Sequence, residues 1–458
     1  MDHQFKNKNN SLELANESSD ISNIVETANE MNVVFVRLQF VDILGTPKNI
    51  IIPTGRLEEA LTEGIPFDGS SIAGYATIEE SDKIAKPDPR SFTILPENIE
   101  KRKTAKINCD IYEPDGKRFD GDTKYILEKI VNKARDLGYI YNTGPECEFF
   151  LFKKNGEKST LTPNDSAGYF DLSHRDIAEG IRADVSLALE EMGINTFTSH
   201  HEVACGQHEI NFRYADAITT ADRTITLKYI TKVISSQHDL HASFMPKPLY
   251  GVAGSGMHVH QSLFTTYGKN AFYDPNGENQ LSDVARHFIA GLLKHIKELC
   301  VILNPTVNSY KRLVSGYEAP TYVSWANGNR SALIRIPSKR EKSTRCELRN
   351  PDLSGNPYLQ FAVMLAAGLK GIEDKLEPPI PVEKNIYSLS EAERREHSIE
   401  RLPDSLGHAL SLMSKSNLLQ DVLGKHIFNN FIYVKRNEWR EYSTQVTKWE
   451  TDKYLSIV

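Results

Sequence analysis

The chain of 458 residues exceeds the length at which a single hydrophobic core stops growing, so it should form two domains. Its composition is that of an ordinary globular protein, with 40% hydrophobic and 25% charged residues. The net charge of -7 argues against nucleic acid as a partner, because binding to a phosphate backbone requires a basic face. No apolar run reaches membrane-spanning length, which predicts that a membrane is not a partner either.

The first 20 residues are polar and rich in Asn, Ser and Lys, which predicts a disordered tail. The same stretch lacks the apolar segment of a secretory signal. Five cysteines without a C-x-x-C pair argue against a disulfide framework. We therefore expect a protein of the reducing cytoplasm.

Residues 21–115 have the pattern of a small, mostly β domain. The run VVFVRLQFVDIL at 33–44 is rich in β-branched and aromatic residues, and Gly45-Thr46-Pro47 separates it from the apolar run NIII. This arrangement predicts a β-hairpin. Short strands and Pro-rich loops continue to about Tyr112 with little helical periodicity.

The remainder, residues 116–458, reads as a second and larger domain that mixes helices and strands. Apolar residues recur at helical spacing over 123–137, 176–192 and 284–303, and Ser282 is a candidate cap for the third helix. Between the helices lie the strand-like runs EFFLF, EINFRY, HASFMPKP and ALIRIP. The pattern predicts an α+β fold with a large, mostly antiparallel sheet flanked by helices.

Six potential metal ligands stand in apolar or glycine-rich stretches, namely GPECEFFLF, HEVACGQHEINF, GSGMHVHQSL and RCELR. Buried carboxylates are costly unless a cation compensates them. Oxygen-dominated ligation favours magnesium or manganese over zinc. The candidate ligands are Glu146, Glu148, Glu202, Glu209, His258 and Glu347.

Each of these motifs has a plainer interpretation when taken alone. Glu146 and Glu148 would share one face of a strand, and such a pair is more often an exposed face than a ligand pair. The apolar run EFFLF beside them disfavours that interpretation. Alternation also predicts that the intervening Cys147 faces away from the acids, as a buried structural thiol.

The other motifs also have structural alternatives. Gly206 could turn the chain so that Glu202 and Glu209 approach each other, although loops of this kind are usually solvated. The glycines of GVAGSGMHVH either let backbone amides approach an anion or form a flexible turn. His258 and His260 alternate on a predicted strand and could share a pocket, yet a lone strand histidine is usually structural.

Arginines accompany the acids in RCELR and in NRSALIRIP. Arg345, Glu347 and Arg349 share one predicted strand face, where they form either a surface ion-pair ladder or a site for anionic substrates beside a metal. The segment SGYEAP carries Glu318 between Gly and Pro residues, which is typical of a mobile loop that closes over a substrate.

Read in order, these motifs resemble glutamine synthetase of the bacterial and archaeal type I class. The resemblance covers nearly the whole chain after residue 30. It includes FDGSS with ESD, GPECEFFLF, YFD, HEVACGQHE and FMPKP. It continues with GSGMHVHQSL, NPTVNSYKRLVSGYEAP, NRSALIRIP and ELRNPDLSGNPYL. The resemblance implies a β-grasp-like N-terminal domain and a catalytic domain with a curved sheet.

The resemblance also implies a role for each matching position. One metal would be held by Glu148, Glu202 and Glu209, and the second by Glu146, His258 and Glu347. Ammonium would be bound and deprotonated by Asp68, with help from Ser71, Tyr169, Glu202 and Glu318. Glutamate would be held beside Gly254 by Arg312 and Arg349. ATP would be contacted by His260, Arg330, Arg335, Lys342 and Arg345.

The implied reaction joins ammonia to the γ-carboxylate of L-glutamate through a γ-glutamyl phosphate, with ATP as substrate and Mg²⁺ or Mn²⁺ as cofactor. The family assembles as two stacked hexameric rings, which implies a dodecamer whose sites are completed by a neighbour's Asp68. The family also binds regulatory proteins, which are therefore possible partners.

Several positions depart from the family pattern. Ala253 stands where Asn is usual beside the glutamate pocket. Ser315 stands where Pro is usual in the loop SGYEAP that carries Glu318, which is called the flap below. Thr77 replaces an arginine that transmits feedback in one branch. Tyr387 matches a tyrosine that is adenylylated in another branch, but its surroundings SLSEAERRE differ.

These departures leave two alternatives beside ammonia ligation. The first is a γ-glutamyl ligase for a polyamine or another amine, which Ala253 favours by enlarging the pocket and which Asp68, Tyr169 and Glu202 oppose. The second is a non-catalytic regulatory paralogue, which the complete set of six ligand-type residues opposes.

Overall fold

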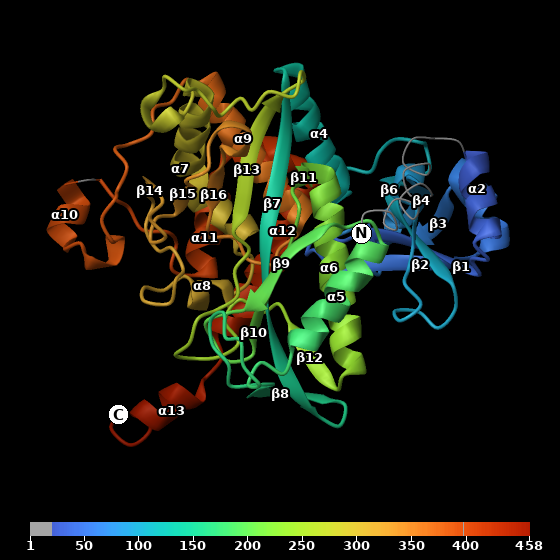
Figure 1. Ribbon diagram of the computed structural model, residues 1–458, viewed down its shortest axis with the longest axis horizontal. Helices are drawn as coiled ribbons and strands as arrows, with labels where there is room; N and C mark the ends of the chain where they lie inside the picture. Colours follow the sequence, from blue (N-terminus) through green and yellow to red (C-terminus); the bar gives the residue numbers. More distant parts are fainter. Residues whose placement is uncertain (1–20, 397) are drawn as a thin grey trace, which may run out of the picture.

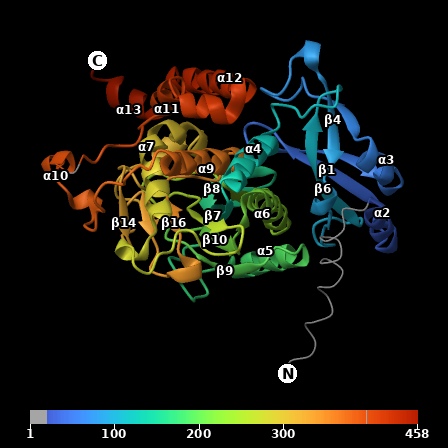
Figure 2. The same cartoon turned by 90° about the horizontal axis from the view of Figure 1, so that it is seen from above.

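The computed structural model describes residues 21–396 and 398–458, so the tail predicted for residues 1–20 lies outside the described residues. Two β-sheets, each with its own hydrophobic cluster, lie side by side (Figures 1 and 2). Helices α4 (Thr123–Asp136) and α6 (Ala217–Gln237) lie between the sheets. Helix α6 packs on the larger sheet, and its Tyr229 hydroxyl donates to Glu100 of the N-terminal part at 3.2 Å.

The N-terminal sheet has the order β2-β1-β6-β4-β3, with β5 paired to β6. Strands β1 and β6 run parallel, and the other pairs are antiparallel. The predicted hairpin is confirmed, since β1 and β2 pair along their whole length around Gly45, whose φ is 82°. The strands are β1 (Phe35–Val41), β2 (Pro47–Pro53), β3 (Ile65–Asp68), β4 (Asp82–Pro87), β5 (Thr93–Ile94) and β6 (Thr104–Tyr112).

Two short helices of this part, α2 (Ile21–Glu30) and α3 (Leu57–Thr62), were not predicted. Helix α2 buries only Ile24 and Ala28, so its apolar stripe is too narrow to stand out beside the polar tail. The mostly β character of the region is confirmed, and the division of the chain at residue 115 stays a prediction.

The large sheet is mostly antiparallel, as predicted, and only β14 and β15 run parallel. Its order is β14-β15-β16-β13-β7-β10-β9, and β8, β11 and β12 also pair with the long strand β7. The strands are β7 (Tyr139–Asn155), β8 (Lys158–Pro163), β9 (Thr196–His201), β10 (Gln207–Phe212), β11 (Ala215–Asp216), β12 (Leu240–Ser243), β13 (Val259–Thr265), β14 (Trp325–Asn327), β15 (Ile334–Ile336) and β16 (Cys346–Leu348).

The predicted strand HASFMPKP ends at Ser243, because Pro246 and Pro248 cannot donate hydrogen bonds to a neighbouring strand. The three predicted helices are present as α4, α5 (Glu179–Glu191) and α7 (Asp283–Leu303). The hydroxyl of Ser282 caps α7 by accepting from the Ala285 amide at 3.2 Å.

The remaining helices lie in the C-terminal part of the chain, and within the described residues each helix is too short or too polar to cross a membrane. They are α8 (Ser309–Arg312), α9 (Pro357–Glu373), α10 (Glu391–Glu396), α11 (Leu406–Met413), α12 (Asn417–Ser443) and α13 (Lys448–Tyr454).

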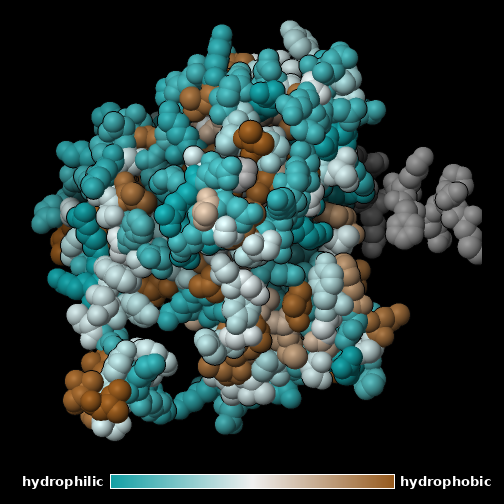
Figure 3. Space-filling view, turned by 90° about the vertical axis from the view of Figure 1, so that its left-hand side faces the viewer, coloured by the Kyte–Doolittle hydropathy of each residue, from teal (hydrophilic) through white to brown (hydrophobic). Residues whose placement is uncertain are grey.

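The last helix, α13, projects away from the body of the molecule at the C-terminus (Figure 1). It and the residues after it form the protruding lobe with hydrophobic colouring at the lower left of Figure 3. Trp449, Leu455 and Ile457 are exposed there. Apolar side chains that find no cover within the chain are typical of a contact surface.

Helices α7 and α9 pack closely because glycines line their contact. A Cβ atom on Gly291 would lie 2.1 Å from the carbonyl oxygen of Ala367 and 2.8 Å from Gly371 Cα. Both obstacles are backbone atoms, so they cannot move aside without separating the helices.

We predict that Gly291→Ala lowers the free energy of unfolding by about 1–3 kcal/mol, the usual cost of overpacking a core. The matched control is Gly180→Ala in α5, where a Cβ would meet nothing within 4 Å. The control should be neutral or slightly stabilising, because Ala favours helix more than Gly. Urea denaturation of the two variants provides the measurement, and equal midpoints would contradict the packing argument.

Candidate active site

Two neighbouring strands set three carboxylates close together. In the register of β7 and β10, Glu148 lies opposite Glu209, and Glu146 lies opposite Asn211. Since alternate residues of a strand share a face, Glu146 and Glu148 project to the same side as Glu209. Cys147 lies on the other face and is fully buried in the hydrophobic core, as the alternation predicts.

One half of the site gathers around Glu146. Its two carboxylate oxygens lie 3.0 Å from His258 Nδ1 and 2.9 Å from His260 Nε2, so both histidines face the same carboxylate. Glu347 Oε1 lies 3.8 Å from His258 Nδ1. Glu146, His258 and Glu347 offer ligand atoms within 4.8 Å of one another, which is the arrangement of a metal-binding triad.

Arginines surround Glu347 on its strand. Arg335 Nε donates to this carboxylate at 2.7 Å, and Arg349 Nη1 donates to it at 3.1 Å. Arg345 Nε donates to His260 Nδ1 at 3.1 Å. Because Glu347 is fully buried, the surface ion-pair ladder that RCELR allowed is excluded.

The other half of the site gathers around His200 on β9, a residue that the sequence interpretation missed. His200 Nε2 lies 2.9 Å from Glu202 Oε1 and 3.9 Å from Glu209 Oε1, and these three residues form a second candidate metal-binding group. The turn that joins the two acids contains Gly206 with a φ of 69°. His200 precedes Glu202 by two positions on an extended segment, and this spacing is the signal that could have found it.

Hydrogen bonds from Gly256 and Gln207 hold Glu148 in place. Its Oε2 accepts from the Gly256 amide at 2.8 Å and from Gln207 Nε2 at 3.2 Å. It lies 4.0 Å from His258 Nε2 and stands between the two groups of ligand atoms. The hydrogen bond from the Gly256 amide shows that the glycine-rich stretch does approach an anion. That anion is a side chain of the protein, Glu148.

The two halves differ in how their negative charge is compensated. Burial opposes ionisation of Glu146, but hydrogen bonds with His258 and His260 hold its pKa well below the usual range. Burial raises the pKa of Glu209 well above its usual range, and repulsion by Glu146 and Glu148 adds to the effect. Burial likewise raises the pKa of Glu148, which lies on the same side. The acids around Glu209 therefore fit a divalent cation, which would supply the charge that the protein lacks there.

A third group of potential ligands, Asp165, His201 and His208, lies behind the acids. Its atoms are already engaged in hydrogen bonds. Arg182 Nη1 donates to His208 Nδ1 at 3.0 Å, His201 Nε2 contacts Asp165 at 3.0 Å, and His201 Nδ1 donates to the Glu202 carbonyl at 2.7 Å. Asp165 also accepts from the Gly206 amide at 2.8 Å. The group therefore anchors the turn that carries Glu202, and the neighbouring arginine disfavours a metal.

Arg312 is buried beside Gly254 and Gly256. Its guanidinium donates to the carbonyls of Asn350 at 2.8 Å and Arg349 at 3.1 Å, so much of its donor capacity holds backbone in place. A Cβ on Gly256 would lie 2.1 Å from its Nη2 atom, and a Cβ on Gly254 would lie 3.3 Å from its Cγ. The glycines therefore make room for a buried arginine.

Other predicted residues lie at the edge of the site. The ring of Tyr169 packs edge-on against His200, with centroids 5.7 Å apart. The loop that carries Glu318 reaches the site through its backbone, where the Glu318 carbonyl accepts from Arg349 at 3.5 Å. Arg330 and Lys342 are exposed, and within the described residues no ion pair joins either of them to the acids.

Asp68 and Ser71 are not brought to the acids within one chain. Asp68 ends β3 of the N-terminal sheet and accepts from the Ser70 amide at 2.8 Å and the Ser70 hydroxyl at 2.7 Å. Figures 1 and 2 both place β3 or its neighbour β4 on the far side of α6 from β10. Both residues are exposed, so they are available to another molecule.

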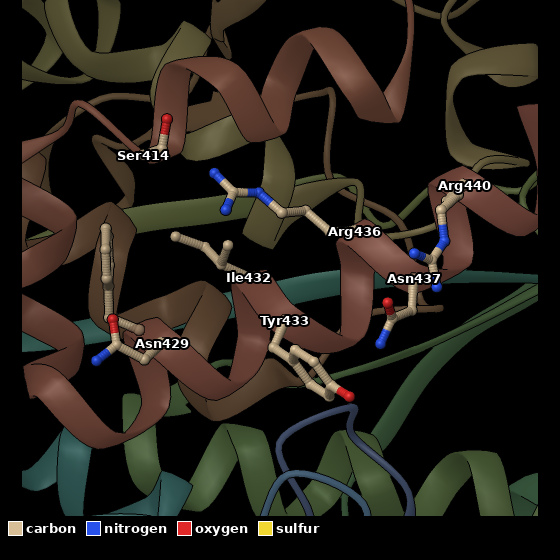
Figure 4. Close-up of a pocket in the computed structure, with 8 residues that line it drawn as sticks. Ser414, Asn429, Ile432, Tyr433, Arg436, Asn437 and Arg440 are labelled. Atoms are coloured by element: carbon tan, nitrogen blue, oxygen red, sulfur yellow. The ribbon is translucent and has the colours of Figure 1, made fainter.

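The acidic centre is also separate from a pocket on the surface of α12. That pocket has a volume of about 540 Å³ and contains none of the predicted site residues (Figure 4). Tyr433, Arg436 and Arg440 of α12 line it.

Comparison with known proteins supports the functional interpretation. The family model for the glutamine synthetase β-grasp domain matches residues 32–114, and the model for the glutamine synthetase catalytic domain matches residues 120–454. A glutamine synthetase of Clostridium saccharobutylicum is 52% identical over 95% of this chain and 98% of the relative. A glutamine synthetase of Thermotoga maritima is 51% identical over 95% of this chain and the whole of the relative.

Solved structures agree in fold. A structure described as "GmaS/ADP complex-Conformation 1" superimposes with a TM-score of 0.86 at 32% identity and covers 94% of this chain and 99% of its own. The family models together match most of the chain, and the predicted β-grasp and α+β architecture is confirmed. The chain therefore belongs to the glutamine synthetase family of ATP-dependent glutamate–ammonia ligases.

Proposed function

We propose that the acidic centre binds two divalent cations, magnesium or manganese, and that the reaction takes place between them and the arginines. Glu146, His258 and Glu347 would hold one cation. Glu202 and Glu209 would hold the other together with Glu148, and His200 would orient both acids. The observation that carries the proposal is geometric: two groups of ligand-type residues at this site each hold their ligand atoms within 4.8 Å of one another. Their carboxylate oxygens suit a hard cation.

The cations, when bound, would neutralise charge that develops on the transferred phosphoryl group. Arg335 and Arg345 would supply further positive charge to the ATP phosphates, since both lie beside the Glu146 half of the site. His260, Arg330 and Lys342 would complete the nucleotide contacts. The exposed position of Arg330 and Lys342 is compatible with binding a ligand that arrives from solvent.

Glutamate would lie between Gly254 and Arg349, with Arg312 fixing the backbone beneath. Its γ-carboxylate oxygen attacks the γ-phosphorus of ATP, and ADP leaves. Ammonia then attacks the acyl carbon, and inorganic phosphate leaves as the amide forms. The loop carrying Glu318 would exclude water from the acyl phosphate.

The flap has an anchor in Tyr387. Its hydroxyl donates to the carbonyl of Ala319 at 2.6 Å, directly after Glu318 in the chain. Tyr387 directly precedes the unusual sequence SLSEAERRE, and its engaged hydroxyl supports a structural role in place of modification. Ser315 faces Thr321 across the base of the same loop, with their hydroxyl oxygens 3.3 Å apart.

We further propose that Asp68 acts in the site of a neighbouring subunit. Hydrogen bonds from the Ser70 side chain and amide lower the pKa of Asp68, which keeps it ionised and suited to binding ammonium. The exposed Asp68 and the acidic centre lie on different faces of one chain, so a ring in which each subunit faces the next would bring them together. The uncovered apolar residues of α13 support an assembly of more than one ring, as in a dodecamer.

Phosphate release in the presence of Mg-ATP and glutamate tests the choice of amine. We expect turnover with ammonium and little or none with methylamine, ethylamine or putrescine at equal concentration of the free base. The partly buried Ala253, which stands where Asn is usual in the family, packs against the cluster of Phe150 and Phe152. Turnover confined to an organic amine would contradict ammonia ligation.

The metal proposal predicts opposite effects of Glu209→Gln on stability and on metal binding. Removing the charge should raise the melting temperature of the chelator-treated enzyme, because three other carboxylates no longer repel it. Affinity for Mn²⁺ should fall by at least about tenfold, since even indirect changes at metal sites cost about 10–100-fold. The control is Glu157→Gln in the exposed turn after β7. A variant that binds Mn²⁺ as tightly as the unchanged enzyme would remove Glu209 from the ligand set.

Mixed assemblies test the contribution of Asp68 across subunits. Asp68→Asn and Glu347→Gln should each abolish most activity when present in every subunit. After the two are unfolded and refolded together in equal amounts, random mixing in a ring should restore about one quarter of the normal sites. Recovery requires Asp68 and Glu347 to come from different chains, so a mixture that stays inactive while forming normal assemblies would place Asp68 elsewhere.

A further inference from the structure

A pocket of about 350 Å³ lies beside α6 and the end of β12, outside the acidic centre. Its charged lining residues are all basic, namely Lys228, Lys232 and His241. Lys228 lies partly buried inside, and Lys232, one helical turn later, is exposed at the rim. The other lining residues are neutral: Ala242, Ser243, Phe244, Met245, Pro246, Thr306, Asn308, Leu353 and Ser354.

Within the described part of the chain, the ammonium groups of this pocket form no ion pair. Among the described residues, neither Lys228 nor Lys232 has a carboxylate oxygen within 4.0 Å. Lys228 Nζ donates to the carbonyl of Leu353 at 2.5 Å and keeps two N–H groups. Both ammonium groups flank the ring of Phe244, each 5.9 Å from its centroid.

The neighbouring acid, Asp352, compensates the charge of Lys228 only in part. Asp352 lies behind the pocket wall, where it accepts hydrogen bonds from Asn304 and Ser354. Burial lowers the pKa of Lys228 to about 8, and repulsion by Lys232 contributes. Burial also lowers the pKa of His241, again with repulsion by Lys232. The two ammonium groups thus repel each other, and an anion between them would stabilise both.

The lining favours phosphate over a carboxylate. No arginine lines the pocket, so the paired donors that grip a planar carboxylate are missing from it. Lysine ammonium groups act as point charges and suit tetrahedral oxyanions. The Ser243 oxygen accepts from the Met245 amide at 3.3 Å, which leaves its O–H free to donate to a further oxygen.

We propose that this pocket is a second anion site that binds a phosphate-type dianion between Lys228 and Lys232. The site is distinct from the one at which ATP and glutamate react. It shares a wall with that site, because Asn308 both accepts from the Lys247 amide at 2.7 Å and directly precedes the helix that ends at Arg312. An anion bound in this pocket would act on the backbone segment that leads from Asn308 to Arg312.

Protection from lysine-selective acylation tests the proposal in the assembled full-length enzyme. The reaction is run at pH 8 with a metal chelator and without nucleotide, and modified lysines are quantified by mass spectrometry. The probe is inorganic phosphate, compared with chloride at equal ionic strength. Modification slows by a factor of 1 + [phosphate]/Kd at an occupied site, or about tenfold at ten times Kd. We expect this protection at Lys228 and Lys232, and none at Lys154, whose ammonium bonds Ser236 outside the pocket.

A pair of variants separates this site from the catalytic one. Lys232→Gln should reduce the protection of Lys228 to less than about one third, because one of the two cationic contacts is lost. Lys154→Gln removes the same charge nearby and should leave the protection unchanged. The proposal is overturned by equal protection of Lys154, by unaltered protection of Lys228 in Lys232→Gln, or by lysines that stay unreactive without phosphate. None of these readouts depends on turnover, so they stand apart from any failure of the proposed catalytic roles.

Discussion

Carboxylates on adjacent strands can stay ionised inside a protein only if positive charge lies close to them. In this chain β7 and β10 place Glu146, Glu148 and Glu209 on one buried face. Histidines and arginines compensate the part of the site near Glu146 and Glu347, whereas Glu209 has only His200 at 3.9 Å, and burial raises its pKa. The protein thus folds with an electrostatic cost at one place. Binding of a cation offsets that cost, which couples the stability of the sheet to the chemistry of the site.

Much of the fold follows from local sequence patterns. The β1–β2 hairpin, the three amphipathic helices and the antiparallel large sheet were predictable because each is set by periodicity, by a cap or by turn residues. Short elements escaped. Helix α2 buries too few side chains to produce a periodic signal. The strand predicted in HASFMPKP ends at Ser243, before the two prolines of that run. The order of strands around β7 depends on contacts between distant segments, so the sequence patterns alone do not determine it.

The site was predictable where alternation on a strand decides direction, and less so where a residue acts through another. His258 and His260 both face Glu146, as their alternation indicates, and Glu347 lies beside the two histidines, where the family resemblance implied it. His200 was missed because an unremarkable His-His pair precedes the acid, and its role appears only when β9 pairs with β10. The network of Asp165, His201 and His208 joins segments about 40 residues apart and therefore has no local signature. Asp68 is recognisable by family resemblance, and its distance from the acids within one chain is a property of the fold.

The glycine-rich stretch illustrates how one sequence feature serves two physical needs. The sequence allowed its glycines either to bring backbone amides to an anion or to form a flexible turn, and the Gly256 amide does donate to a carboxylate, that of Glu148. Yet a side chain on Gly256 would also overlap Arg312, so the same residue is required for packing. Arg312 in turn donates hydrogen bonds to the carbonyls of Asn350 and Arg349. These bonds fix the end of the strand that carries Glu347. Glu148, Gly256 and Arg312 therefore depend on one another for their positions. A change in the backbone near Arg312 would therefore also move Arg349, whose side chain binds Glu347.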